Sequence, residues 1–166
     1  LIISWYDAMD NSGNRNHYDA VNSYNDIWMK PEDGKIPADE FFMNFNWSQG
    51  KVQGTADHMK SIGRSPYDAF AGLELQRDIS YTRINRAALL GPDNKLKISL
   101  GLFVPDTING EAETPEMLHD AINKFWTGEN RNPADIDDNP SKYNGMARYV
   151  VDTTPILEPE FHTSFN

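Results

Sequence analysis

Four short apolar segments recur along the chain, each rich in β-branched or aromatic residues and bounded by turn-forming residues. Segments of this kind are typical of buried β-strands. The pattern therefore predicts strands at residues 1–6, 41–47, 69–75 and 97–104.

The segments between these strands carry the spacing of helices. Their apolar residues recur at intervals of three or four, which is the period of one helical face. Proline at the first helical position and glycine just after the last are further helix signals. Thr114 can cap the last of these helices, and Pro115 can occupy its first position. The predicted helices span residues 18–29, 52–62, 81–90 and 115–128.

Strands and helices therefore alternate four times, which predicts an α/β fold with a parallel sheet and crossover helices. Four such units make half of a (β/α)8 TIM-type barrel, or most of a small doubly wound sheet. A complete barrel takes about 250 residues, and this chain has 166. The remaining segment, residues 130–166, is rich in Asn, Asp and Pro and predicts a loop with one short strand at 147–152.

Side chains alternate between the two faces of a strand. This alternation places polar residues of three strands on one face of the sheet, which suits a barrel mouth that binds a polar ligand. The alternative is that the asparagines bond one another across a buried sheet. The polar face would hold Ser4, Tyr6, Asn44, Asn46, Gly72 and Glu74, and the opposite face Ile3, Trp5, Met43, Phe45, Leu73 and Leu75.

Composition narrows the function classes. A net charge of −10 argues against a nucleic-acid partner. The absence of cysteine excludes disulfides and zinc-thiolate sites, and the four histidines lack metal-ligand spacing, so no metal is expected. No glycine-rich phosphate loop and no apolar run of membrane-spanning length is present, so neither a nucleotide cofactor nor a membrane span is expected. Four Trp, seven Tyr and many Asn favour a carbohydrate ligand, with ordinary core aromatics as the alternative.

Several residues at predicted strand ends can carry chemistry. Asp7 and Glu74 could form the carboxylate pair of a glycosidase. Alternatively, Asp7 bonds the amides of the following loop, and Glu74 is neutralised by a basic neighbour. The Tyr6 hydroxyl can donate a hydrogen bond to a sugar or amide oxygen, and Trp47 can stack on a sugar ring.

The strand motifs also carry a family resemblance. Residues 5–9 (WYDAM), 41–47 (FFMNFNW) and 63–75 (GRSPYDAFAGLEL) resemble glycoside hydrolase family 85, the endo-β-N-acetylglucosaminidases. The segments LKISLGLFVP and FHTSFN are also similar to the family, so that the resemblance extends over residues 1–166.

The resemblance implies a TIM-barrel enzyme that cleaves the β-1,4 bond in the di-N-acetylchitobiose core of N-linked glycans, with retention by substrate assistance. The family's general acid is the Glu of an Asn-x-Glu motif on the strand before the Trp-Tyr-Asp strand. The one Asn-x-Glu of this sequence, Asn109-Gly110-Glu111, does not match that context. The resemblance therefore implies that residues 1–166 are the C-terminal half of the barrel, with the N-terminal half and its general acid missing.

Matched to the family motifs, Tyr6 corresponds to the catalytic tyrosine that bonds around the reacting acetamido group. Trp47 corresponds to an active-site tryptophan, and Asn44 and Asn46 line the same mouth. From their places at predicted strand ends, Asp7 and Glu74 are also expected to bind substrate, as are Trp47, Asn44 and Asn46. The sequence departs from the family at two places. His17-Tyr18 stands where members often carry tryptophan, and Glu74 where they usually carry aspartate.

The expected partner is thus an N-linked glycan or glycoprotein, with no cofactor, and the expected location is secreted, at the cell surface, or cytoplasmic. The apolar first residues and the aromatic last residues also favour a piece of a longer protein, or one trimmed to its ordered part. Two other functions stay open: a non-catalytic carbohydrate-binding half barrel, and a two-carboxylate glycosidase that uses Asp7 and Glu74.

Overall fold

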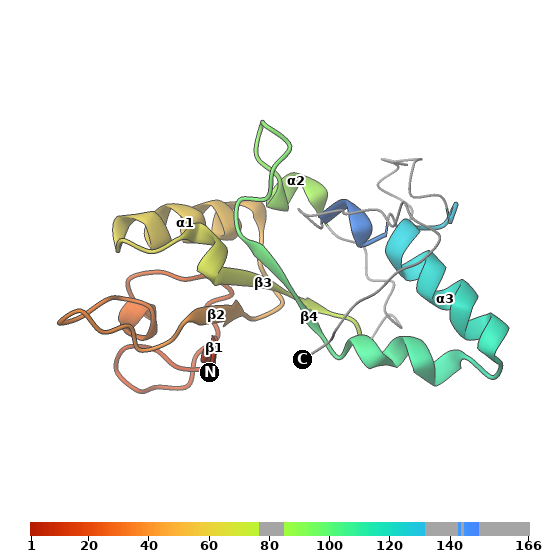
Figure 1. Cartoon of the computed structure of the whole chain (residues 1–166). Coiled ribbons are helices and arrows are strands. Elements are labelled where there is room, and N and C mark those ends of the chain that lie inside the picture. The colour runs from red at the N-terminus through yellow and green to blue at the C-terminus, as the bar shows by residue number, and fades with distance from the viewer. Residues whose placement is uncertain (77–84, 132–142, 144, 150–166) are drawn as a thin grey trace.

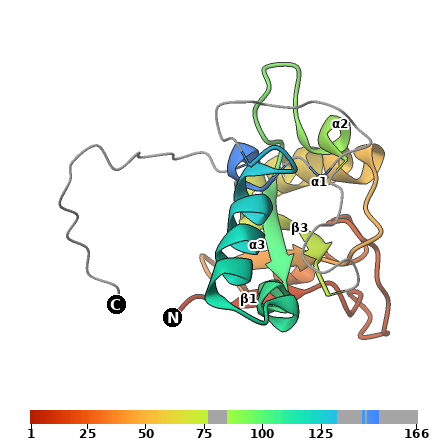
Figure 2. The same cartoon turned by 90° about the vertical axis from the view of Figure 1, so that its right-hand side faces the viewer.

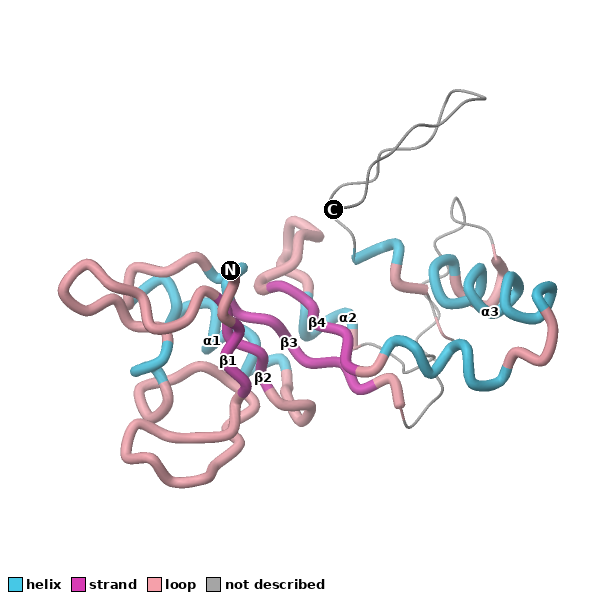
Figure 3. Tube along the Cα trace, turned by 60° about the horizontal axis from the view of Figure 1, so that its bottom comes forward, coloured by secondary structure: helices cyan, strands magenta, loops and turns pink. Residues whose placement is uncertain are grey.

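A computed structural model describes residues 1–76, 85–131, 143 and 145–149 of the chain. Its strands β1 (Ser4–Tyr6), β2 (Glu40–Met43), β3 (Ala69–Glu74) and β4 (Ser99–Phe103) form one parallel sheet in the order β1-β2-β3-β4 (Figure 3). All four predicted strands are confirmed, and each is shorter than its apolar segment. Sequential parallel neighbours of this kind are the repeating arrangement of a TIM-type barrel.

The helices lie beside this sheet. Helices α1 (Gln49–Ser61) and α2 (Arg86–Leu89) lie together on one side of it, and α3 (Pro115–Thr127) lies beyond β4 (Figures 1 and 2). Four short 3-10 helices complete the described elements: η1 (Asp26–Trp28), η2 (Pro66–Asp68), η3 (Pro105–Glu111) and η4 (Ala147–Tyr149). Within the described ranges, no helix has the length and apolarity needed to cross a bilayer.

Two of the predicted helices are confirmed closely. Helix α1 contains residues 52–61 of the 52–62 prediction and ends one residue earlier, with Ile62 as its C-cap. It begins three residues before the prediction because Ser48 acts as its cap and accepts a hydrogen bond from the Lys51 backbone amide. Helix α3 starts as predicted, with Pro115 first and the Thr114 hydroxyl accepting from the Met117 amide at 3.2 Å. Of the helix predicted at 81–90, the structure shows Arg86–Leu89 as α2. Residues 81–84 lie outside the described part.

The predicted helix at 18–29 is wrong, because the segment is a loop that contains only η1. Asp19 has a φ of 53°, outside the helical region. The Tyr24 amide donates to the Asn22 side chain at 2.8 Å, and the Asn22 amide donates to the Asn25 side chain at 2.8 Å. These side chains offer the backbone an alternative to helical hydrogen bonds, as Asn and Asp commonly do.

The predicted strand at 147–152 is not seen where it can be checked. Residues 147–149 form the 3-10 helix η4 instead. Residues 150–152 lie outside the described part of the chain, as does the FHTSFN segment.

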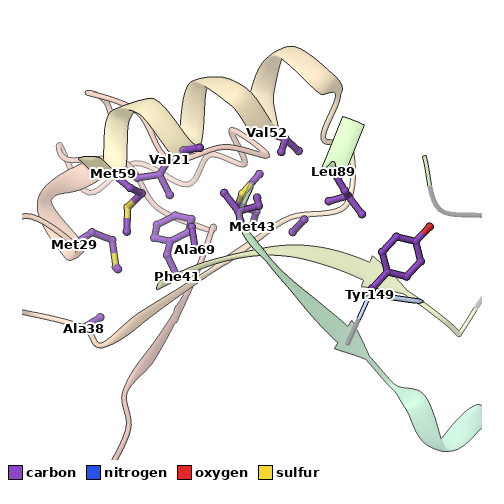
Figure 4. Packing of buried hydrophobic residues seen from close by; sticks show 13 residues of the cluster. Val21, Met29, Ala38, Phe41, Met43, Val52, Met59, Ala69, Leu89 and Tyr149 are labelled. Carbon is purple, nitrogen blue, oxygen red and sulfur yellow. The ribbon is translucent and has the colours of Figure 1, made fainter. Parts of the chain in front are cut away.

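A first hydrophobic cluster fills the space between the sheet and α1 (Figure 4). Phe41 and Met43 of β2 face Val52 and Met59 of α1, and all four side chains are fully buried. The neighbouring strand contributes only alanines to this layer, which lets the helix pack close to the sheet. A second cluster joins the end of β3 to η3 and α3 through Leu73, Leu75, Ile108, Phe125, Tyr143 and Met146.

The opposite face of the sheet is more aromatic than predicted. The Phe42 ring lies over β3 and β4, where Gly72 and Gly101 are paired in register and leave room for it. Phe45 was predicted under the helices, but it follows the end of β2, and its ring contacts Phe42 and Phe103 at centroid distances of 6.3 and 5.3 Å. Strand alternation therefore fails after Met43.

The prediction for Ile3 is also wrong. It precedes β1 and is 49% exposed instead of packing under a helix. Trp5, Met43, Leu73 and Leu75 are placed as predicted, packed in or against the two clusters.

The long connection between β1 and β2 is fastened by Arg64, a buried residue just after α1. Its guanidinium donates to the carbonyl oxygens of Met29, Ala38 and Asp39 at 3.1, 3.0 and 2.6 Å. It also forms an ion pair with Asp68 at 2.9 Å. One side chain thereby satisfies three loop carbonyls and ties the loop to the helix layer.

The close approach of β2 and β3 yields a test of the packing. A Cβ at position 72 would overlap the Met43 carbonyl and the Phe42 ring. We expect Gly72→Ala to lower the free energy of unfolding by about 1–3 kcal/mol, the usual cost of overpacking. Gly54→Ala in α1, where a Cβ meets nothing within 4 Å, should instead raise it by about 0.5–1 kcal/mol. Urea denaturation of both variants measures this, and equal effects would contradict the packing described.

Candidate active site

The side chains that could take part in catalysis or ligand binding lie together where β1 and β2 end. Tyr6 is the last residue of β1 and pairs in register with Phe42, and Asp7 and Asn44 directly follow the two strands. In α/β barrels this carboxyl edge of the parallel sheet carries the active site. The edge also receives the loop that follows β1, which contributes Asp19.

Asp7 is fully buried and accepts four hydrogen bonds. One carboxylate oxygen accepts from the Tyr18 amide and the Asn25 side chain, both at 3.2 Å. The other oxygen accepts from the backbone amides of Asp19 at 2.6 Å and Asn44 at 3.5 Å. Burial raises the pKa of Asp7, although these hydrogen bonds oppose the shift. Asp7 thus has the structural alternative role foreseen from the sequence, that of bonding the amides of the following loop.

Tyr6 lies at the surface of the same edge and is 41% exposed. Its hydroxyl donates to the Asn44 side-chain oxygen at 2.7 Å. Its ring stands at 5.7 Å from the His17 ring and 6.2 Å from the Phe42 ring, measured between centroids. The phenol is therefore held in one orientation with an open side toward solvent.

Asp19 connects Asn44 to a lysine of α1. The Asn44 side-chain nitrogen donates to one carboxylate oxygen of Asp19 at 2.8 Å, and the Asn46 amide donates to the same oxygen at 3.1 Å. Lys51 forms an ion pair with the other oxygen at 2.7 Å. Tyr6, Asn44, Asp19 and Lys51 thus form one continuous chain of polar contacts, which we call the Tyr6–Lys51 relay.

The electrostatics of the relay follow from these contacts. Burial would raise the pKa of Asp19, but the hydrogen bonds from Lys51, Asn46 and Asn44 outweigh it and lower that pKa below its ordinary value. Asp19 is therefore ionised at neutral pH. The pKa of Tyr6 is raised, first by burial and then by the negative charges of Asp7, Asp19 and Glu74. The Tyr6 hydroxyl consequently keeps its proton throughout the physiological range.

The other predicted site residues lie at the same edge with different environments. The Trp47 indole nitrogen donates to the Gly72 carbonyl at 2.6 Å, and the half-buried ring packs against the first hydrophobic cluster. Asn46 is exposed, and its carbonyl accepts from Lys51 at 3.4 Å. Glu74 is the half-buried last residue of β3.

Sequence reasoning brought Tyr6, Asn44, Asn46 and Trp47 to one edge, and the structure places them there. It missed Asp19 and Lys51. A signal for Lys51 exists only once the start of α1 at Gln49 is known, because a cation in the first turn of a helix opposes the helix dipole unless an anion compensates it. Asp19 was hidden inside the wrongly predicted helix at 18–29.

The carboxylate pair proposed from the sequence does not form a shared open site. Asp7 has no exposed surface, so only Glu74 of the two can meet a ligand in this structure. Among the described residues, no group of three His, Asp or Glu side chains is placed to hold a metal ion.

A family model described as Glycosyl hydrolase family 85 matches residues 1–166. The chain belongs to glycosyl hydrolase family 85. The chain that carries this fold and these motif residues is therefore a member of a glycoside hydrolase family, as the sequence resemblance implied. No protein with a curated description matches the chain.

Among solved structures, this family 85 chain is similar to the glycoside hydrolase domain of Spr0440, Endo-D, from Streptococcus pneumoniae R6. The two share 42% sequence identity, with a TM-score of 0.81. The match covers 89% of this chain and 24% of the Endo-D chain, so the present chain spans about a quarter of that structure. Its sheet corresponds to part of a TIM-type barrel.

The bonding of Asp7 predicts a large effect of an isosteric change. Each carboxylate oxygen of Asp7 accepts hydrogen bonds from two donors. In Asp7→Asn, an NH2 group replaces one of these oxygens in either orientation of the side chain, and it would face two N–H groups without an acceptor. We expect a loss of about 1–3 kcal/mol in the free energy of unfolding, the usual cost of unsatisfied buried donors. Thermal and urea denaturation measure it, with Asp57→Asn on the exposed face of α1 as the control. A variant as stable as the control would contradict the anchoring role.

Proposed function

We propose that the chain is part of an endo-β-N-acetylglucosaminidase that hydrolyses the β-1,4 bond in the di-N-acetylchitobiose core of N-linked glycans. The observation that carries the proposal is a family 85 chain with its Tyr6–Asn44 pair at the carboxyl edge of a parallel sheet. The likeness to the Endo-D glycoside hydrolase domain supports it.

The proposed reaction uses the substrate's own acetamido group as nucleophile. Its carbonyl oxygen bonds to the anomeric carbon while the glycosidic C–O bond breaks and an acid protonates the leaving oxygen. Water then attacks the anomeric carbon and gives a proton to the former acid, while the bond between that carbon and the acetamide oxygen breaks. This restores the acetamide, and the product keeps the anomeric configuration of the substrate. Because the amide is already in position, the protein needs to supply only an acid–base group and polar groups that orient the acetamide.

In this chain Tyr6 is the group we assign to the acetamide, with Asn44 holding its hydroxyl. Trp47 and Glu74 flank the same edge and are assigned to substrate binding together with Asn46. The buried Asp7 supports the site from below instead of touching the sugar.

We further propose that the general acid comes from an upstream half of the barrel. Asn109-Gly110-Glu111 lies in the 3-10 helix η3 and not on a strand, so it does not provide the family's strand-borne pair. Among the residues that the structure describes, no strand pairs with the outer edge of β1, and Leu1, Ile2 and Ile3 beside it are exposed. An unpaired edge with adjacent apolar residues favours a further strand as its partner.

N-linked glycans of this kind are carried mainly by secreted and surface proteins. We therefore propose that the enzyme acts as a secreted or cell-surface protein, and the argument depends on the substrate assignment.

The role of Tyr6 is tested by Tyr6→Phe in the full-length enzyme. We expect kcat for glycan release from an N-glycoprotein to fall by about 10- to 100-fold, because one oriented polar group is lost at the reacting amide. Tyr24→Phe, at a 66% exposed tyrosine of the following loop, should keep wild-type activity. Mass spectrometry should find one N-acetylglucosamine left on the asparagine. Release of the whole glycan, or no release by the wild type, would refute the proposed activity.

The division of the barrel is tested with residues 1–166 alone. We expect no hydrolysis by this chain, because its described part offers no acid that matches the family's position. Hydrolysis by the isolated chain that is lost in Glu74→Gln would contradict the proposal and return the chemistry to carboxylates of this half. Glycan binding without hydrolysis by the full-length protein would favour a binding module.

A further inference from the structure

The Tyr6–Lys51 relay fixes more than the position of the Tyr6 ring. Asp19 is an ionised carboxylate and can only accept hydrogen bonds, so the group of Asn44 that faces it at 2.8 Å must be the NH2. The Asn44 carbonyl then faces Tyr6, and it too can only accept. The single proton of the Tyr6 hydroxyl is therefore committed to Asn44, across 2.7 Å.

From this arrangement we propose that Asp19 and Lys51 are positioning residues that set the polarity of Tyr6, so that its oxygen accepts a hydrogen bond from an N–H or O–H group of the ligand. The inference rests on the proposed function insofar as that ligand is an N-acetylated sugar, whose acetamide N–H is a fitting donor. It departs from the simplest sequence expectation, in which the phenol donates to a substrate oxygen.

The surroundings of Asp19 show why the carboxylate keeps this role. Asp19 is 6% exposed, and its two oxygens are bonded by Asn44, Asn46 and Lys51. Lys51 reaches it from the first turn of α1, while the helix start is held by the Ser48 cap. Lys51 brings a positive charge to this buried carboxylate at 2.7 Å, and without Lys51 the charge of Asp19 would be compensated only by the hydrogen bonds from Asn44 and Asn46. The lysine therefore supports the orientation of Tyr6 through two intervening side chains.

The first test is a double-mutant cycle in the full-length enzyme. Asn is well suited to the positive φ of 53° at position 19, so Asp19→Asn leaves the backbone unstrained. If Asp19 acts through Tyr6, Asp19→Asn should lower kcat by about 10- to 100-fold with little change in KM. In the Tyr6→Phe background the same change should cost less than about 2-fold, because the group it positions is already gone. Additive losses would indicate a merely structural role and overturn the proposal.

Lysine variants provide a matched series. Lys51→Met should reproduce the loss of Asp19→Asn, and Lys51→Arg should restore most of the activity because it keeps a cation beside Asp19. Lys60→Met and Asp57→Asn, at exposed positions of the same helix, should behave as wild type. Equal activity of Lys51→Met and Lys60→Met would overturn the part assigned to Lys51.

A second readout does not need catalysis. The titration of Tyr6 can be followed by NMR of tyrosine labelled with carbon-13 at Cζ, with the Tyr6 signal identified by its loss in Tyr6→Phe. In Asp19→Asn the pKa of Tyr6 should fall, because a negative charge is removed and Asn44 becomes free to turn its NH2 toward the phenolate. Asp57→Asn should leave it unchanged.

The two readouts separate the possible failures. An unchanged Tyr6 titration in Asp19→Asn overturns the positioning role whether or not the enzyme is active. A lowered pKa together with an inactive wild type would refute the proposed hydrolase function and leave the coupling of Asp19 to Tyr6 in place.

Discussion

The buried carboxylate of Asp7 is the contact on which the architecture of the site depends. It stands at the end of β1 and holds three separate pieces of chain: the loop amides of residues 18 and 19, the side chain of Asn25, and the amide that follows β2. Burying a charge is costly, and four hydrogen-bond donors offset part of that cost here. Two of these bonds bring the backbone of Asp19 and Asn44 to the edge where Tyr6 emerges. The site is therefore built around an acid that is itself fully buried.

The features of the fold that could be predicted are those set by local pattern. Apolar segments marked the four strands, and Thr114 with Pro115 marked where α3 begins. The error at 18–29 has a local cause as well, since its apolar spacing suits a helix while Asn22 and Asn25 bond the backbone in competing turns. The error at Phe45 came from extending strand alternation past Met43, where β2 stops.

The candidate site divides along a similar line. Tyr6, Asn44 and Trp47 could be placed from their strand positions and from the family resemblance. Asp19 and Lys51 could not, because their meeting joins a loop residue to a helix 32 positions away, and no periodic pattern encodes such a contact. The direction of the Tyr6 proton was equally hidden, since it follows from the acid that stands behind Asn44 and not from the tyrosine itself.

The Arg64 guanidinium gives the long loop an unusual response to cleavage. One of its nitrogens bonds the carbonyls of both Met29 and Ala38, which stand on either side of the exposed stretch 30–37. A protease that cuts in this stretch, at the turn of Asp33 and Gly34, would break the covalent chain between two points that the same side chain still joins. In the nicked protein β1 would stay paired with β2, and the two fragments would separate only when the protein was denatured.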